Sequence, residues 1–177
     1  MSQDISYVRI SAGETVPLRH SVLWPDQPVS YVLLPEDSSG FHYGVITINS
    51  KDVDDSNAEA LHAPVAVISL FGEALPPVAA TESAGLNPSL ASSRSSATPT
   101  TARFRKFACD PSYQGRGIGT GLLQHTFAIA KEELQCSVVW CDARMETAGW
   151  YERRGMRKFG ETFWKGDIEY VRMRIDI

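Results

Sequence analysis

The chain has 177 residues, of which 43% are hydrophobic and 21% are charged, and its formal net charge is −4. This length suggests a single domain, and the apolar share can build a core, which excludes a globally disordered chain. The slightly acidic balance excludes a general affinity for nucleic acids. The longest apolar runs are far shorter than the ~20 residues that a membrane helix needs, so we expect no membrane partner.

The N-terminus and the cysteines point to one compartment. The first ten residues contain neither a basic stretch nor a long apolar stretch, so we expect no secretory signal. The three cysteines, Cys109, Cys136 and Cys141, form no C-x-x-C pair, which favours reduced thiols over a zinc site or a disulfide framework. These features predict a cytoplasmic protein.

Charge is divided unevenly along the chain. Residues 1–102 contain four basic and eleven acidic residues, whereas residues 103–177 contain thirteen basic and ten acidic residues. An anionic ligand would therefore fit the C-terminal part better.

The N-terminal half predicts strands and one helix. Residues 5–10 alternate as a short strand, and Glu14–Trp24 has the apolar spacing of a helix that Pro25 and Pro28 end. Two strand-like runs follow at 43–49 and 64–71, joined by an acidic loop at 51–59.

Residues 74–101 differ in composition from the rest of the chain. Alanine, serine, threonine and proline fill 20 of these 28 positions, and none is aromatic. Such a segment buries too little apolar area to offset its chain entropy, so we expect a disordered insertion between two strands of one domain, 1–177.

The C-terminal part alternates regularly between strands and helices. The strands are expected at 103–109, 137–141, 156–161 and 169–175, and the helices at 117–134 and 145–154. Gly155 suits the position after the second helix. The pattern predicts an α/β (α+β) fold with one sheet.

A glycine-rich turn joins the first of these strands to the first helix. It reads Gln114-Gly115-Arg116-Gly117-Ile118-Gly119-Thr120-Gly121. Alternating glycines let the backbone approach a ligand, and the helix N-terminus offers unpaired N–H groups to an anion such as a pyrophosphate. The arginine would add a charge-assisted contact.

The spacing of this turn argues against the common nucleotide folds. In a G-x-G-x-x-G fingerprint the third glycine would fall on Thr120 or Leu122, depending on the starting glycine. A P-loop needs Gly-Lys-Ser/Thr, and the turn contains no lysine.

The residues from Phe107 to Gly119 (FACDPSYQGRGIG) resemble the acyl-CoA signature of the GNAT superfamily of N-acyltransferases: a strand, x-Pro-x-x-(Gln/Arg)-x-x-Gly-x-(Gly/Ala), then a helix. Asp142 to Met156 (DARMETAGWYERRGM) is similar to the family's second motif, in which a helix of small residues carries an aromatic–tyrosine pair. The opening strand and residues 18–25 also fit, so the resemblance covers most of the chain outside 74–101.

The resemblance implies a mixed, mostly antiparallel sheet whose middle strands splay apart, and acetyl-CoA as the cosubstrate. The backbone of Phe107, Ala108 and Cys109 would pair with the pantetheine. The pyrophosphate would bind at the turn, and the cofactor contacts there would come from Gln114, Gly115, Arg116, Gly117, Ile118, Gly119 and Thr120.

The resemblance also implies N-acetyltransfer, with Tyr151 as the catalytic acid. A phenol with a pKa near 10 can give its proton to a departing thiolate. No carboxylate lies within 103–109 or 137–141, so the base is open: Asp142, Glu146, His42 or His62 acting through water, or no dedicated base.

Three positions depart from the family or invite another mechanism. Arg144 stands where many relatives have an asparagine that contacts the cofactor, and it could reach the pantetheine or the phosphates. Met156 replaces the closing phenylalanine. Cys109 suggests an acyl-cysteine intermediate, but an apolar strand raises a thiol pKa, which favours an inert residue.

Three functions therefore compete. The first is acetyl transfer to a primary amine of a small molecule or a protein, the second is an inactive acyl-CoA sensor or scaffold, and the third is a nucleotide hydrolase. The acceptor would be chosen by loops near 18–28, 41–43 and 163–169, and Asp52, Asp54 and Asp55 could attract a cationic amine. A monomer and a homodimer are both open.

Overall fold

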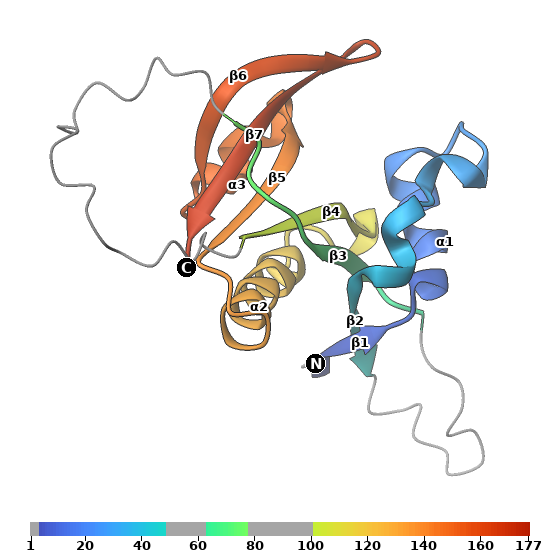
Figure 1. The fold of residues 1–177 in the computed structure, drawn as a ribbon. Helices are drawn as coiled ribbons and strands as arrows, with labels where there is room; N and C mark the ends of the chain where they lie inside the picture. Colours follow the sequence, from blue (N-terminus) through green and yellow to red (C-terminus); the bar gives the residue numbers. More distant parts are fainter. Residues whose placement is uncertain (1–3, 49–62, 78–100) are drawn as a thin grey trace, which may run out of the picture.

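The computed structural model describes residues 4–48, 63–77 and 101–177. They form one seven-stranded sheet in the order β1-β2-β3-β4-β5-β7-β6, in which the β4–β5 pair is parallel and the others are antiparallel. The strands are β1 (Asp4–Ile10), β2 (Phe41–Ile48), β3 (Ala66–Gly72), β4 (Thr101–Cys109), β5 (Val138–Arg144), β6 (Arg157–Lys165) and β7 (Ile168–Asp176). The expected mixed, mostly antiparallel α/β fold is confirmed (Figure 1).

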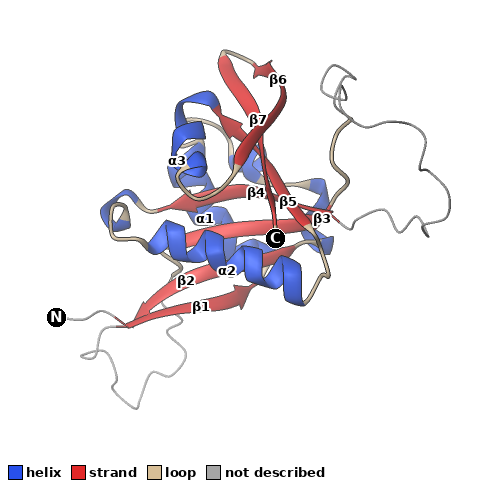
Figure 2. Cartoon of the chain, turned by 90° about the vertical axis from the view of Figure 1, so that its left-hand side faces the viewer, coloured by secondary structure: helices blue, strands red, loops and turns tan. Residues whose placement is uncertain are grey.

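Helices cover both faces of this sheet. They are α1 (Ala12–Leu23), α2 (Ile118–Glu132) and α3 (Ala148–Glu152), with 3₁₀ turns that include η1 (Val29–Val32), η2 (Pro35–Ser39) and η6 (Met145–Thr147). Along β3, Val67 packs in a cluster with Leu18 of α1, whereas Ile68 joins the main core with Leu122 of α2. Because neighbouring strand residues point to opposite faces, α1 and α2 lie on opposite sides of the sheet (Figure 2).

The first helix begins two residues before the predicted Glu14. Ser11 caps it: the Glu14 amide donates to Ser11 Oγ, and the Ser11 amide donates to a Glu14 carboxylate oxygen. This reciprocal pair satisfies two amides that a helix start leaves unpaired. Glu14 therefore belongs to the first turn and does not begin the helix.

The predicted helix 145–154 is divided into two short pieces. Strand β5 continues to Arg144, a 3₁₀ turn covers Met145–Thr147, and α3 ends at Glu152. Gly155 adopts φ +87°, a left-handed conformation that suits the residue after a helix.

The middle of the sheet opens between β4 and β5. Their pairing covers only Thr101–Arg103 against Val138–Trp140, although both strands run on beyond it. Figure 1 shows the two strands diverging from this point. The expected splaying of the central strands is confirmed.

Two predicted segments fall largely outside the described residues. The acidic loop 51–59 lies outside them entirely, as do residues 78–100 of the expected insertion. At its end, Thr101 is already part of β4, and its hydroxyl donates to the Glu73 carbonyl at 2.7 Å.

Candidate active site

A cavity of about 560 Å³ lies where β4 and β5 diverge. Its walls come from β4, β5, the end of α1, the turns after α1, α3 and the β6–β7 hairpin. Lining residues include Trp24, Tyr31, Phe104, Lys106, Gln114, Asp142, Arg144, Tyr151, Lys165 and Tyr170. The expected acceptor regions 18–28 and 163–169 contribute to this lining, whereas 41–43 does not.

Tyr151 of α3 stands in the wall of this cavity. Its ring packs against Phe104 at 5.8 Å and, edge to face, against Trp150 at 5.0 Å between ring centroids. Burial raises the pKa of the Tyr151 phenol well above its ordinary value, with a smaller contribution from Cys141. The phenol therefore stays protonated at neutral pH, as a proton donor must.

The glycine turn leads directly into α2. Gly115 and Gly117 have φ of +73° and +82°, and Gly117 is the N-cap of the helix. A Cβ at either position would meet open space, so conformation and not crowding requires glycine there. The turn thus leaves its backbone accessible beside the positive end of the α2 dipole.

Other residues of the turn are placed by short contacts. Gln114 donates a side-chain hydrogen bond to the Cys109 carbonyl at 3.0 Å, and Asp110 accepts from the Ser112 amide at 2.8 Å. Arg116 is exposed, with its guanidinium 5.4 Å from the centre of the Tyr113 ring. Nothing fixes this guanidinium in an ion pair among the described residues, so it can reach a ligand at the turn.

Arg154 is a candidate that the sequence reasoning missed. Its Nε donates to Thr120 Oγ1 at 2.8 Å, its Nη1 donates to the Trp150 carbonyl at 2.7 Å, and its guanidinium stacks 3.5 Å from the centre of the Trp150 ring. A positive charge therefore stands over the first turn of α2. Its position in the second motif, three residues after Tyr151, was the sequence signal that could have suggested a role for Arg154 in this site.

The strand residues expected to pair with pantetheine lie beside a bulge. Val67 of β3 pairs with Ala108, but Ser69 pairs with Arg105, so Lys106 and Phe107 are inserted opposite one residue. Phe107 contacts the position of Gly119, where a Cβ would lie 3.4 Å from its ring. The bulge thus brings β4 against the glycine turn.

Cys109 and Arg144 are the two remaining sequence candidates. Burial raises the pKa of the Cys109 thiol, which fits an inert residue and not a nucleophile. Arg144 reaches towards α1, where it donates to the Leu23 carbonyl at 3.3 Å and lies 5.1 Å from the centre of the Trp24 ring. It lines the cavity from this position, and cofactor binding by Arg144 stays a prediction.

Asp142 is the only proposed base within the described residues that lines the cavity. Strand β5 extends to Arg144 and not only to the predicted residue 141, so it contains Asp142. The expectation that the two central strands carry no carboxylate is therefore corrected. The Asp142 carboxylate pairs with Arg103 at 2.5 Å, Lys165 at 2.7 Å and, more distantly, Arg172 at 3.9 Å. The carboxylate is therefore already engaged in ion pairs on the cavity wall.

The other proposed bases lie elsewhere. Glu146 is exposed and 3.8 Å from Arg144, and His62 is outside the described residues. His42 is buried, with Nε2 2.8 Å from the Asp37 carbonyl and Nδ1 2.7 Å from Ser69 Oγ. Since a carbonyl only accepts, Nε2 donates to it, and Nδ1 is engaged with the serine hydroxyl, so neither ring nitrogen is free.

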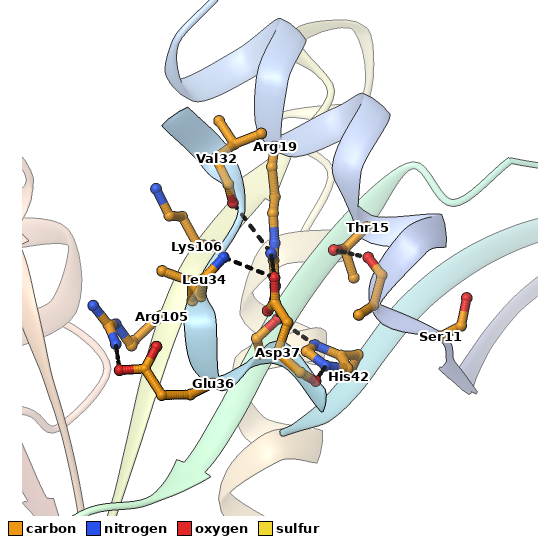
Figure 3. A network of polar contacts seen from close by, with 12 residues as sticks. Ser11, Thr15, Arg19, Val32, Leu34, Glu36, Asp37, His42, Arg105 and Lys106 are labelled. Atoms are coloured by element: carbon orange, nitrogen blue, oxygen red, sulfur yellow. Dashed lines mark hydrogen bonds and ion pairs between the residues drawn. The ribbon is translucent and has the colours of Figure 1, made fainter. Parts of the chain in front are cut away.

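A buried arginine fixes the turns beside the cavity (Figure 3). Arg19 of α1 is fully buried and pairs with both oxygens of Asp37 at 2.9 Å. It also donates to the Val32 carbonyl at 3.2 Å and to Ser69 Oγ at 2.6 Å, while Asp37 accepts from the Leu34 amide. This network ties α1, η1, η2 and β3 together.

Comparison with known proteins shows which family the chain resembles. The family model of the acetyltransferase (GNAT) domain matches residues 84–157. No curated protein matches the sequence. The resemblance to the GNAT superfamily is therefore confirmed by a family model over this part of the chain, and by the fold over the described residues.

Solved structures share this fold at low sequence identity. An inferred N-acetyltransferase from Lactobacillus plantarum is 14% identical with a TM-score of 0.66, and the match covers 99% of both chains. FeeM, an N-acyl amino acid synthase from uncultured soil microbes, is 10% identical with a TM-score of 0.65, over 99% of this chain and 92% of that one. A GNAT family acetyltransferase from Elizabethkingia anophelis with acetyl-CoA bound is 14% identical with a TM-score of 0.59, over 98% of both chains.

Among the described residues, no helix is both long and apolar enough to cross a membrane.

Proposed function

We propose that this protein transfers an acetyl group from acetyl-CoA to a primary amine by direct attack of the amine on the thioester. The observation that carries this proposal is the cavity between the diverging strands, which has a protonated phenol in its wall. The family model over 84–157 supports an acyltransferase of this superfamily.

Acetyl-CoA would bind along β4 and at the start of α2. The inner edge of β4 from Phe104 onwards is not paired with β5, so Phe107, Ala108 and Cys109 can offer backbone groups to the pantetheine. The pyrophosphate would accept hydrogen bonds from amides between Gly115 and Thr120.

The reaction balances with the groups present. The neutral amine attacks the thioester carbon, the new C–N bond forms, and the C–S bond breaks as the carbonyl is restored. The thiolate takes a proton from the Tyr151 hydroxyl, and the amine gives its proton to water. A proton from water then restores the phenol, so the net products are the amide and the CoA thiol. Because Asp142 is paired with three cations, we expect no side-chain carboxylate to take that proton directly.

The same feature of Asp142 favours the second candidate, an acyl-CoA sensor of this fold without turnover. Both functions require acetyl-CoA to bind. They differ in the next step, because only the enzyme releases CoA when an amine is present.

The deciding experiment follows release of free CoA thiol from acetyl-CoA with a panel of primary amines, and identifies products by mass spectrometry. If the protein is the proposed enzyme, at least one amine should give an acetylated product. Acetyl-CoA binding in calorimetry without any acetylated product would favour the sensor. Butyryl- and hexanoyl-CoA in parallel assays test the preference for acetyl.

A further inference from the structure

The cavity is rich in positive charge. Four of its lining residues are basic and one is acidic, namely Arg105, Lys106, Arg144, Lys165 and Asp142. The acidic residue already pairs with Lys165, and also with Arg103 and Arg172 behind it. The lining therefore has an excess of positive charge at the place where an acceptor would enter.

Three of the four basic residues have a carboxylate of their own. Arg105 lies 3.4 Å from Glu36, Arg144 lies 3.8 Å from Glu146, and Lys165 pairs with Asp142. No carboxylate among the described residues lies within ion-pair distance of Lys106. Its Nζ donates to the Tyr31 carbonyl at 3.2 Å and lies 5.9 Å from the centre of that ring.

The backbone places Lys106 at this point. It is in the β4 bulge with φ +52°, an uncommon conformation for a residue other than glycine. A bulge re-aims a side chain, and here the side chain faces the cavity from the same strand segment as Phe107. Figure 3 shows Lys106 and Arg105 beside the network that contains Arg19 and Asp37.

The charge on Lys106 is poorly compensated in this environment. Burial lowers the pKa of Lys106, and the nearby charges of Arg19 and Arg105 lower it further, while Asp37 acts in the opposite direction. The Asp37 carboxylate is bound on both oxygens by Arg19. A partly buried ammonium without a counter-charge is costly, and an anionic ligand offsets that cost.

We infer that the acceptor is an amine that also carries a carboxylate, such as an α-amino acid, and that Lys106 binds this carboxylate. The inference rests on the proposed function. Trp24, Tyr31 and Tyr170 supply aromatic walls for the rest of the acceptor. The expectation that Asp52, Asp54 and Asp55 draw in a cationic amine concerns a loop outside the described residues and stays a prediction.

Binding of the substrate carboxylate is consistent with a cavity whose described residues include no free base. The positive lining favours the neutral form of an incoming amine, because nearby cations disfavour its protonation. The carboxylate holds the substrate in place while the ammonium group loses its proton to water.

The experiment compares matched acceptors that differ in the carboxylate. L-leucine, leucinamide and isoamylamine form one set, and L-phenylalanine, phenylalaninamide and phenethylamine form another. We expect kcat/KM for the amino acid to exceed that for its amide and its decarboxylated amine by about tenfold or more, in line with one charge-assisted contact.

Variants then assign the effect to Lys106. Lys106→Met should remove the preference for the amino acid and leave the amides and decarboxylated amines within about twofold, whereas Lys106→Arg should retain part of it. Lys131→Met, on the exposed side of α2, is the matched control and should keep the full preference. Thermal melting confirms that each variant is folded.

Three outcomes would overturn the inference. Wild-type protein could prefer the amines without a carboxylate. Lys106→Met could lower kcat/KM equally for all acceptors. It could also raise the KM for acetyl-CoA while the amino acid preference persists, which would place Lys106 on the cofactor.

Product binding separates this inference from the proposed function. If no acceptor turns over, the proposed enzyme is wrong, and calorimetry with N-acetyl-L-leucine and N-isoamylacetamide still tests the site. Tighter binding of the N-acetyl amino acid that Lys106→Met abolishes supports the carboxylate site. Equal binding of both compounds, or binding of neither, contradicts it.

Discussion

The two sides of the cavity are held in place by different kinds of interaction. On one side, the glycine turn, which lines the cavity through Gln114, is shaped by its backbone, with Gly115 and Gly117 at positive φ. On the other, the turns after α1 are tied down by the side chains of Arg19 and Asp37, which are 18 residues apart, and by Ser69, which is 50 residues from Arg19. The first side is determined by local sequence, and the second by contacts between distant parts of the chain.

This contrast gives the largest expected effect to the buried arginine. Arg19→Met removes the partner of the partly buried Asp37 and should lower the free energy of unfolding by about 3–5 kcal/mol, as for other broken buried pairs. Chemical denaturation measures this loss. Arg153→Met, on an exposed residue, is the control and should stay within about 0.5 kcal/mol. An equally small change for Arg19→Met would show that the network does not hold this side.

Acid should break the same pair without a substitution. Burial alone would raise the pKa of Asp37, but hydrogen bonds from Arg19 and the Leu34 amide, with the charge of Arg19, hold it below its ordinary value. The pair therefore contributes stability above about pH 4, where the unfolded chain has ionised, and loses it as the pH falls through the folded pKa. Asp37→Asn should flatten this part of the stability curve between about pH 5 and pH 2, and an unchanged slope would contradict the assignment.

Tyr151→Phe should have the largest effect on catalysis. The substitution keeps the packing against Phe104 and Trp150 but removes the proton donor, so kcat should fall about 10²- to 10³-fold with little change in the Kd of acetyl-CoA. The matched control is Tyr43→Phe, since the buried Tyr43 hydroxyl has no hydrogen-bond partner among the described residues. If both variants keep full activity, Tyr151 is not the acid.

The backbone side is tested by Gly117→Ala. An alanine at φ +82° is strained by about 1–2 kcal/mol, which should weaken acetyl-CoA binding about five- to thirtyfold if the turn must relax. Gly72→Ala is the control, because a Cβ there meets nothing within 4 Å and its φ is not positive. Calorimetry with acetyl-CoA compares the two. Equal affinities would separate the shape of the turn from cofactor binding.

The smallest expected effect is that of Arg116→Ala. The guanidinium is exposed, so the loss in acetyl-CoA affinity should be about two- to fivefold and should shrink as salt is added. Arg154→Ala sharpens the comparison, because Arg154 is held in place by Thr120 and Trp150. At high salt, its loss should therefore reduce acetyl-CoA affinity more than the loss of Arg116 does. The opposite order would assign the phosphate contact to the exposed arginine.

The same contrast explains how much could be predicted from sequence. The strands, the glycine turn and Gly155 follow from local patterns, because glycine at positive φ and alternating apolar residues leave a local signal. The family resemblance singled out Tyr151 as the catalytic acid; the structure has this residue in the cavity wall, and its catalytic role stays a prediction.

The missed features depend on contacts between distant segments. The burial of Arg19 depends on its contacts with Asp37 and Ser69. An arginine within a predicted helix carries no local sequence signal that it is buried. The orientation of Lys106 depends on a bulge that exists only in the pairing of β4 with β3. The three cations around Asp142 come from three strands, so a reading of β5 alone could not reveal them.

The opening between β4 and β5 gives the sheet a border in its interior. Amides at the joined end, Thr101 to Arg103, should exchange slowly with deuterium, since both strands contribute to a ladder there. The inner edges beyond Arg103 and Trp140 should exchange as rapidly as a free strand at the rim of a sheet. An acyl-CoA that completes the ladder would slow exchange at this border as well as at the glycine turn, so the amides of the inner edge would report directly whether the cofactor is bound.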